Sequence, residues 1–88
     1  MTRAIIYSKN NCVYCSRAKA LLDARGIPYK ELIIDTQGRD DRMLTENQSW
    51  TTRDELLRIK PTAKTVPQIW LDGEYVGGFT ELDAKLNL

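Results

Sequence analysis

The chain has 88 residues, 42% of them hydrophobic and 28% charged, which suits one small globular domain with a modest core and leaves no room for a second. Thirteen basic and twelve acidic residues give a formal net charge of +1, and the lysines and arginines are scattered, which argues against nucleic acid as a partner. The apolar run at residues 4–7 is too short for a signal peptide, and no stretch is long enough to span a bilayer. We therefore expect a cytoplasmic, monomeric single domain over residues 1–88 that does not interact with membranes.

The first 34 residues predict a strand, a helix and a second strand. The apolar run RAIIYS, residues 3–8, contains β-branched and aromatic residues typical of a buried strand. A helix is predicted from Val13 to Arg25, and Gly26 is suited to the left-handed position just past a helix end. The segment PYKELII, residues 28–34, predicts the second strand. This βαβ unit should place its two strands parallel to each other.

The middle of the chain predicts a long loop followed by a second helix. Residues Asp35 to Trp50 are polar and lack apolar periodicity, so we expect a loop there, with a helical turn near Asp41 to Glu46. The segment TTRDELLRIK contains a capping box formed by Thr52 and Glu55, and the helix should end before Pro61.

The last third of the chain predicts a hairpin and a final helix. The strands are expected at Gln68 to Leu71 and Glu74 to Val76, joined by the Asp-Gly turn at 72–73. The helix should start near Thr80, a possible N-cap, with two leucines four residues apart facing the core. The predicted order is β-α-β-α-β-β-α, an α/β fold with a mixed four-stranded sheet flanked by about three helices.

Both cysteines of the chain, Cys12 and Cys15, lie at the start of the first predicted helix. A structural zinc site needs four Cys or His ligands, and a chain without histidine would have to supply carboxylates or a second subunit. A structural disulfide across so short a loop would stabilise the fold by only about 2 kcal/mol. A CxxC pair beside a βαβ unit in a reducing compartment instead indicates thioredoxin-like redox chemistry.

The two thiols are expected to have different roles. Cys12 precedes the helix, where unpaired backbone N–H groups and the helix dipole favour a thiolate, and Lys9 adds positive charge nearby. Cys15 lies one turn further along the helix and is less accessible, but it is close enough to attack a mixed disulfide at Cys12. The sequence thus predicts Cys12 as the nucleophile and Cys15 as the resolving thiol.

Four segments resemble the glutaredoxin family, in the order that the family has them. YSKNNCVYC resembles its Lys-x-x-Cys-x-Tyr-Cys active site, RAKALL the helix that follows, KTVPQIW its Thr-Val-cis-Pro segment and VGGFTEL its Gly-Gly glutathione-binding turn. The resemblance covers the chain from about Ala4 to Leu86. It implies a thioredoxin-like fold and a glutathione-dependent dithiol oxidoreductase, in which Cys12 forms the mixed disulfide with glutathione, Cys15 resolves protein disulfides and Tyr14 flanks the sulfur.

The resemblance also implies a binding site for glutathione. Thr65 and Val66 would run beside the cysteinyl backbone of glutathione, and Val66 would exchange main-chain hydrogen bonds with it as an added strand does. The peptide bond before Pro67 would be cis, a rare feature in proteins. Lys9 and Lys64 would pair with the glycine carboxylate.

The remaining contacts implied by the resemblance lie at the start of the last helix. Gly78, Phe79 and Thr80 would present backbone groups to the γ-glutamyl carboxylate, because a helix N-terminus attracts anions. Glu81 would face the γ-glutamyl ammonium. Glutathione is then the co-substrate, and no metal is expected.

The partners implied by the family are disulfide-containing proteins, among them ribonucleotide reductase. Two alternatives stay open. One is a glutaredoxin-like electron donor to ribonucleotide reductase that thioredoxin reductase recharges. The other is an iron–sulfur carrier in which Cys12 of two subunits and two glutathiones hold a cluster, although the single-cysteine CGFS pattern of such carriers is absent.

Two features depart from the family pattern. Val13 follows the first cysteine where most dithiol glutaredoxins have proline, although some small glutaredoxins and glutaredoxin-like donors carry valine there. This position affects the redox potential, for which we expect the glutaredoxin range of roughly −200 to −230 mV. The loop from Asp35 to Trp50 is also longer than the family norm.

Overall fold

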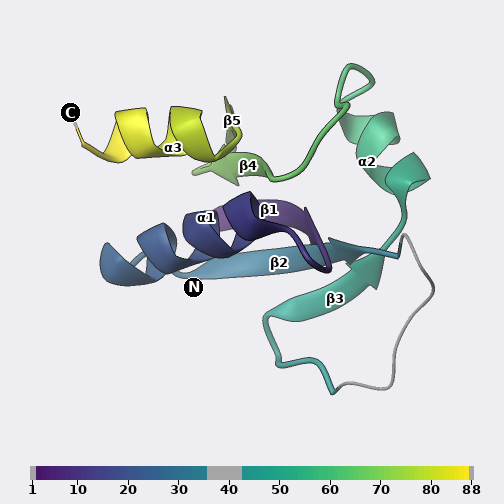
Figure 1. Cartoon of the computed structure of the whole chain (residues 1–88), viewed down its shortest axis with the longest axis horizontal. Coiled ribbons are helices and arrows are strands. Elements are labelled where there is room, and N and C mark those ends of the chain that lie inside the picture. Colours follow the sequence, from purple (N-terminus) through teal and green to yellow (C-terminus); the bar gives the residue numbers. More distant parts are fainter. Residues whose placement is uncertain (1, 36–42, 88) are drawn as a thin grey trace.

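The computed structural model describes residues 2–35 and 43–87, which form a five-stranded sheet with helices on both faces (Figure 1). The strands lie in the order β3-β2-β1-β4-β5. β1, β2 and β3 run parallel to one another, and β4 pairs antiparallel with both of its neighbours, β1 and β5. No helix within these residues is long and apolar enough to cross a membrane. The elements are β1 (Ala4–Lys9), α1 (Val13–Ala24), β2 (Tyr29–Ile34), β3 (Gln48–Thr51), α2 (Arg53–Ile59), β4 (Gln68–Leu71), β5 (Glu74–Gly77) and α3 (Phe79–Leu86).

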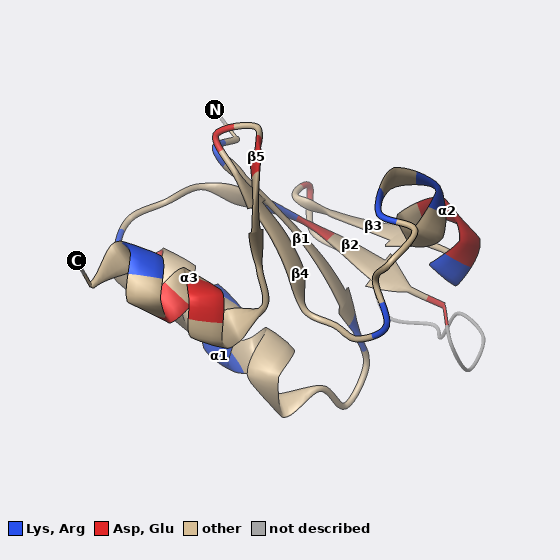
Figure 2. Ribbon diagram, turned by 90° about the horizontal axis from the view of Figure 1, so that it is seen from above, with Lys and Arg blue, Asp and Glu red and all other residues tan. Residues whose placement is uncertain are grey.

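The sheet has a hydrophobic cluster on each face, because successive side chains of a strand point to opposite sides. Ile6 of β1 and Ile69 of β4 pack with Leu22 of α1 and Leu82 of α3, and all four side chains are fully buried. Tyr7, the next residue on β1, belongs to a second cluster that includes side chains of α2. Figure 2 accordingly shows α1 and α3 together on one side of the sheet and α2 on the other.

Two predicted chain reversals are confirmed. Gly26 follows α1 with φ +66°, and the N–H of Ile27 donates to the carbonyl of Leu22 at 2.9 Å, the long hydrogen bond of a Schellman ending. Between β4 and β5, Asp72 and Gly73 have φ +52° and +85°, as a two-residue hairpin turn requires.

The predicted four-stranded sheet is wrong by one strand, because β3 lies within the segment predicted as a loop. It is short, and all of its side chains are half-buried, so it has no alternation of buried and exposed positions for sequence reasoning to detect. It is held by parallel pairing with β2, in which Gln48 lies opposite Glu31. The helical turn predicted near residues 41–46 is absent from the described part, 43–46, and residues 41 and 42 lie outside the described residues.

Helix α2 begins with the predicted cap. The hydroxyl oxygen of Thr52 accepts a hydrogen bond from the N–H of Glu55 at 3.1 Å. A Thr52→Ala variant leaves that N–H without its cap, so we expect it to lower the free energy of unfolding by about 1 kcal/mol. For a domain of this size that corresponds to a fall in Tm of roughly 4–8 °C, measurable by circular dichroism. Thr51→Ala is the neighbouring control, and an equal loss in both variants would contradict the capping role.

Candidate active site

The redox pair lies at the first turn of α1, directly after β1. Cys12 is the N-cap residue, and it forms a disulfide with Cys15 with the two Cα atoms 5.2 Å apart. The side chain of Cys15 is buried, whereas Cys12 is half-buried. The backbone N–H of Cys15 donates to Sγ of Cys12 at 3.2 Å. This hydrogen bond and the helix N-terminus favour negative charge on Cys12, the more accessible sulfur.

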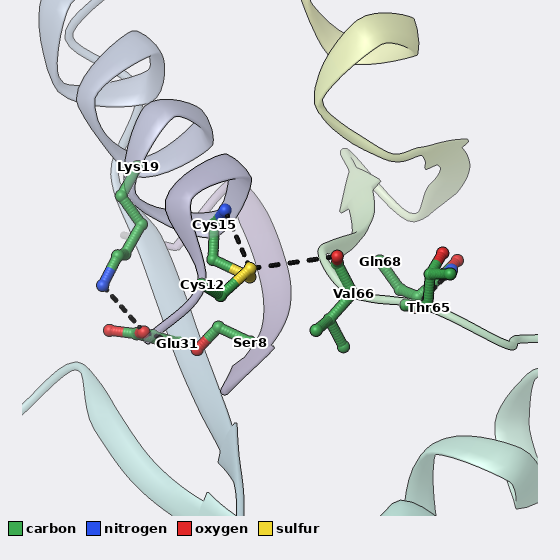
Figure 3. Close-up of a disulfide and its surroundings, with 8 residues drawn as sticks. All are labelled: Ser8, Cys12, Cys15, Lys19, Glu31, Thr65, Val66 and Gln68. Atoms are coloured by element: carbon green, nitrogen blue, oxygen red, sulfur yellow. Dashed lines mark hydrogen bonds and ion pairs between the residues drawn. A yellow bond between two sulfur atoms is a disulfide. The ribbon is translucent and has the colours of Figure 1, made fainter. Parts of the chain in front are cut away.

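The segment before β4 approaches the same sulfur. The carbonyl oxygen of Val66 lies 3.9 Å from Sγ of Cys12 (Figure 3), and the Val66–Pro67 peptide bond is cis, as predicted. A disulfide sulfur has no hydrogen to donate, so a hydrogen bond at this contact requires the reduced Cys12 thiol. The backbone of Val66 is therefore placed beside the atom at which thiol exchange takes place.

A groove with a volume of about 320 Å3 runs between the start of α1, the loop before β4 and the start of α3. We call it the α3 groove. The ring of Tyr14 is exposed at its edge, with its centroid 6.2 Å from the ring of Phe79 and 5.5 Å from the guanidinium carbon of Arg17. The structure thus brings together eight of the residues singled out from the sequence. They are Tyr14, Thr65, Val66, Pro67, Gly78, Phe79, Thr80 and Glu81.

The two lysines singled out from the sequence do not line the α3 groove. Lys9 lies at the end of β1 and lines a second pocket, which it shares with both cysteines, Lys19 and Glu31. Lys64 is exposed and directly precedes Thr65 in the chain. Positive charge from Lys9 is therefore available in the pocket that contains both cysteines, but not in the α3 groove.

The start of α3 differs from the prediction. The N-cap is Gly78 rather than Thr80, and the helix begins at Phe79. The carboxylate of Glu81 accepts a hydrogen bond from the N–H of Gly78 at 2.7 Å, so the two residues assigned to the carboxylate and the ammonium of the γ-glutamyl end contact each other. A Cβ atom at Gly77, which has φ +125°, would lie 2.9 Å from the same carboxylate oxygen, so this close approach needs glycine.

Sequence reasoning missed a buried charged residue beside the redox pair. Glu31 of β2 is only 3% exposed, and its carboxylate accepts hydrogen bonds from Ser8 at 2.5 Å, Lys19 at 2.9 Å and Gln48 at 2.9 Å. Burial raises the pKa of this carboxyl, but its three hydrogen bonds and the charge of Lys19 lower it, and the net result is a pKa below the ordinary value. The only hint in the sequence is that Glu31 follows Lys30 within a predicted strand whose other residues are apolar or aromatic.

The described residues contain no group of three or more His, Cys, Asp or Glu side chains arranged to hold a metal ion. The chemistry of the site is carried by its two sulfurs. An accessible cysteine at a helix N-terminus, a buried partner three residues later and a cis-proline loop beside them define a thiol–disulfide oxidoreductase of the thioredoxin-like fold.

Comparison with known proteins agrees with this class. The glutaredoxin family model matches residues 4–76. Glutaredoxin 3 of Escherichia coli strain K12 is 36% identical over 84 residues, which cover 96% of this chain and 86% of the relative. The crystal structure of glutaredoxin 1 from Francisella tularensis, complexed with cacodylate, superposes with a TM-score of 0.70 at 31% identity, covering 96% of this chain and 91% of that one. A buckwheat glutaredoxin–glutathione complex gives a TM-score of 0.69 at 27% identity, covering 97% and 68%.

The chain therefore belongs to the glutaredoxin family, glutathione-dependent thiol–disulfide oxidoreductases. The predicted family, the thioredoxin-like α/β fold and the enzyme class are confirmed, with glutathione as co-substrate of the family.

Proposed function

We propose that this chain, acting as one glutaredoxin domain, removes glutathione from mixed disulfides through Cys12 alone and reduces protein disulfides through Cys12 and Cys15 together. The observation that carries the proposal is the α3 groove. Eight residues from three separate segments line one depression, and its Val66 wall lies 3.9 Å from the exchanging sulfur. A groove that ends at the nucleophile can bind one half of a disulfide while the other half leaves.

The bound half is glutathione, a tripeptide thiol with two carboxylates and an extended backbone. Val66 would exchange main-chain hydrogen bonds with its cysteinyl residue, as an added strand does. The N–H groups of Phe79 and Thr80, in the first turn of α3, have no partner within the helix and suit the γ-glutamyl carboxylate. Lys9 and Lys64 are the candidate partners of the glycine carboxylate. Glu81 would face the γ-glutamyl ammonium while it still caps α3.

The monothiol reaction consists of two successive thiol–disulfide exchanges. The Cys12 thiolate attacks the glutathionyl sulfur of a mixed disulfide, the substrate S–S bond breaks, and the released thiolate takes up a proton. A second glutathione, as its thiolate, then attacks the glutathionyl sulfur on Cys12, which releases oxidised glutathione and restores the Cys12 thiolate.

The dithiol reaction uses both cysteines. Cys12 forms a mixed disulfide with the protein substrate, and Cys15 loses its proton and attacks Sγ of Cys12. The substrate leaves with two thiols and the enzyme keeps the Cys12–Cys15 disulfide, which two glutathione molecules reduce. Ribonucleotide reductase is a substrate that the family resemblance supports, and the reducing cytoplasm is the compartment in which a catalytic pair of this kind operates.

Substrate preference tests the proposal. We expect kcat/KM for a glutathione–cysteamine mixed disulfide to exceed that for cystamine, which lacks the glutathionyl group, by at least about tenfold, since each contact in the groove adds about 0.5–1.5 kcal/mol. Both values are measured as the second-order rate constant for reaction of the reduced enzyme with each disulfide, without free glutathione, because free glutathione converts cystamine into the same mixed disulfide. Equal values would contradict glutathione binding in the α3 groove. If thioredoxin reductase and NADPH reduced the enzyme without glutathione, that result would favour the alternative of a glutaredoxin-like donor recharged by thioredoxin reductase.

A further inference from the structure

Two polar side chains behind the α3 groove connect β5 to the loop that carries Val66. Gln68 is 6% exposed, and its Nε2 donates to the carbonyl oxygen of Thr65 at 2.7 Å. The hydroxyl of Tyr75 donates to Oε1 of the same amide at 2.5 Å. Figure 3 shows Gln68 beside Thr65, on the far side of Val66 from Cys12.

The orientation of the Gln68 amide is determined by its partners. A carbonyl oxygen only accepts hydrogen bonds, so the NH2 group must face Thr65. The amide oxygen then faces Tyr75, whose hydroxyl must donate. Because the amide is buried and both of its ends are paired, a reversed amide would leave buried polar groups unsatisfied.

Tyr75 is itself held in place. It lies opposite Trp70 in the β4–β5 register, and the two rings meet edge to face with centroids 5.1 Å apart. The ammonium of Lys60 lies 4.2 Å from the centroid of the Tyr75 ring, within the range of a cation–π interaction. The hydroxyl that meets Gln68 is thus carried by a ring with contacts on two sides.

This arrangement fixes the peptide unit that faces the substrate. The C=O of Thr65 and the N–H of Val66 belong to one planar trans peptide and point in opposite directions. With the carbonyl of Thr65 bonded to Gln68, the N–H of Val66 points away from Gln68. The next carbonyl, that of Val66, lies against Sγ of Cys12. The side chain of Gln68 therefore sets the direction of the Val66 N–H, and the adjoining cis peptide carries the Val66 carbonyl to Cys12.

We propose that Gln68 and Tyr75 are positioning residues for glutathione binding. They hold the Thr65–Val66 peptide so that the N–H and C=O of Val66 are presented to the cysteinyl backbone of glutathione, while neither side chain contacts the ligand. The inference rests on the proposed function, because it names the residues that prepare the backbone of the same groove.

Three variants test it. Tyr75→Phe removes only the hydroxyl, and Gln68→Glu keeps an acceptor for Tyr75 but removes the donor to Thr65. Tyr29→Phe removes the hydroxyl of a half-buried tyrosine on β2, outside the groove, and is the matched control. We expect KM for the glutathione–cysteamine mixed disulfide to rise about 3- to 10-fold in Tyr75→Phe, the equivalent of one hydrogen bond, and further in Gln68→Glu. The control stays at the wild-type value.

Two further readings separate positioning from a general loss of structure. In both variants kcat for the mixed disulfide should stay within about twofold of wild type. The rate constant for cystamine with the reduced enzyme, measured without free glutathione, should be unchanged, because cystamine has no glutathionyl group to bind in the groove. Unchanged KM values in both variants would overturn the inference, and so would parallel losses with both substrates. A wild-type protein that does not distinguish the two substrates overturns the proposed function, whereas a preference that both variants retain in full overturns only this inference.

Discussion

A Cys12→Ser variant loses all measurable turnover of a glutathione mixed disulfide, whereas Cys15→Ser retains substantial activity with the same substrate. The attacking group must be a thiolate at the mouth of the groove, and Cys12 is the sulfur that is half-exposed, capped by the N–H of Cys15 and next to Val66. A serine hydroxyl ionises far less readily than a thiol, so the loss should exceed about a hundredfold. The measurement is NADPH consumption coupled to glutathione reductase.

The same two variants separate the two reactions of the enzyme. Cys15 is buried, and its role is to attack the mixed disulfide on Cys12 from inside the protein. Cys15→Ser should therefore lose the reduction of a protein disulfide, such as that of insulin, while it still removes glutathione from a small mixed disulfide. If Cys12→Ser remained active, or if Cys15→Ser lost both reactions equally, the assignment of nucleophile and resolving thiol would be wrong.

The parts of the fold that could be predicted are those with a local signal. α1 ends at Ala24 because Gly26, two residues later, adopts a left-handed conformation. α2 begins at Arg53 because the side-chain oxygen of Thr52, the N-cap residue, accepts a hydrogen bond from the third residue of the helix. β3 had no such signal, because it is short, half-buried throughout and stabilised by pairing with β2. The start of α3 was misplaced by the same logic, since Thr80 is a plausible cap by residue type and the real cap uses Glu81 and the backbone of Gly78.

The candidate site was predictable where family motifs cover it and not elsewhere. The motifs pointed to the residues of the α3 groove, which the fold brings together from α1, the cis-proline loop and α3. They could not show that Lys9 lines a second pocket, together with both cysteines, rather than the α3 groove. Nor could they show that Glu31 is buried beside the redox pair. A buried glutamate needs hydrogen-bond partners, and those of Glu31 come from three other elements, β1, α1 and β3.

Replacing Lys19 by methionine is expected to destabilise the fold strongly at neutral pH, because it leaves the Glu31 carboxylate buried without its cation. The ammonium of Lys19 lies 2.9 Å from the carboxylate, and the side chains are 28% and 4% exposed. Breaking a fully buried pair costs about 3–5 kcal/mol, and because Lys19 is partly solvated we expect a loss of about 2 kcal/mol at pH 7. Methionine retains a long apolar side chain, so the change isolates the charge. Urea unfolding measures the loss, with the exposed neighbour Lys30→Met as control.

The pH dependence of that loss identifies its cause. The pKa of Glu31 in the folded protein is below its ordinary value of 4.5, so the carboxylate contributes stability above about pH 4.5 that is lost as the pH falls through the folded pKa. In Lys19→Met the influences of the ammonium that lower this pKa are gone, and burial raises it. The difference in unfolding free energy between wild type and variant should therefore be largest near neutral pH and shrink as the pH falls through the folded pKa of Glu31 in the wild type, below which Glu31 is protonated in both proteins. A difference that stays constant from neutral pH down through the acid titration of Glu31 would mean that Lys19 stabilises the fold through the packing of its aliphatic stem rather than through its charge.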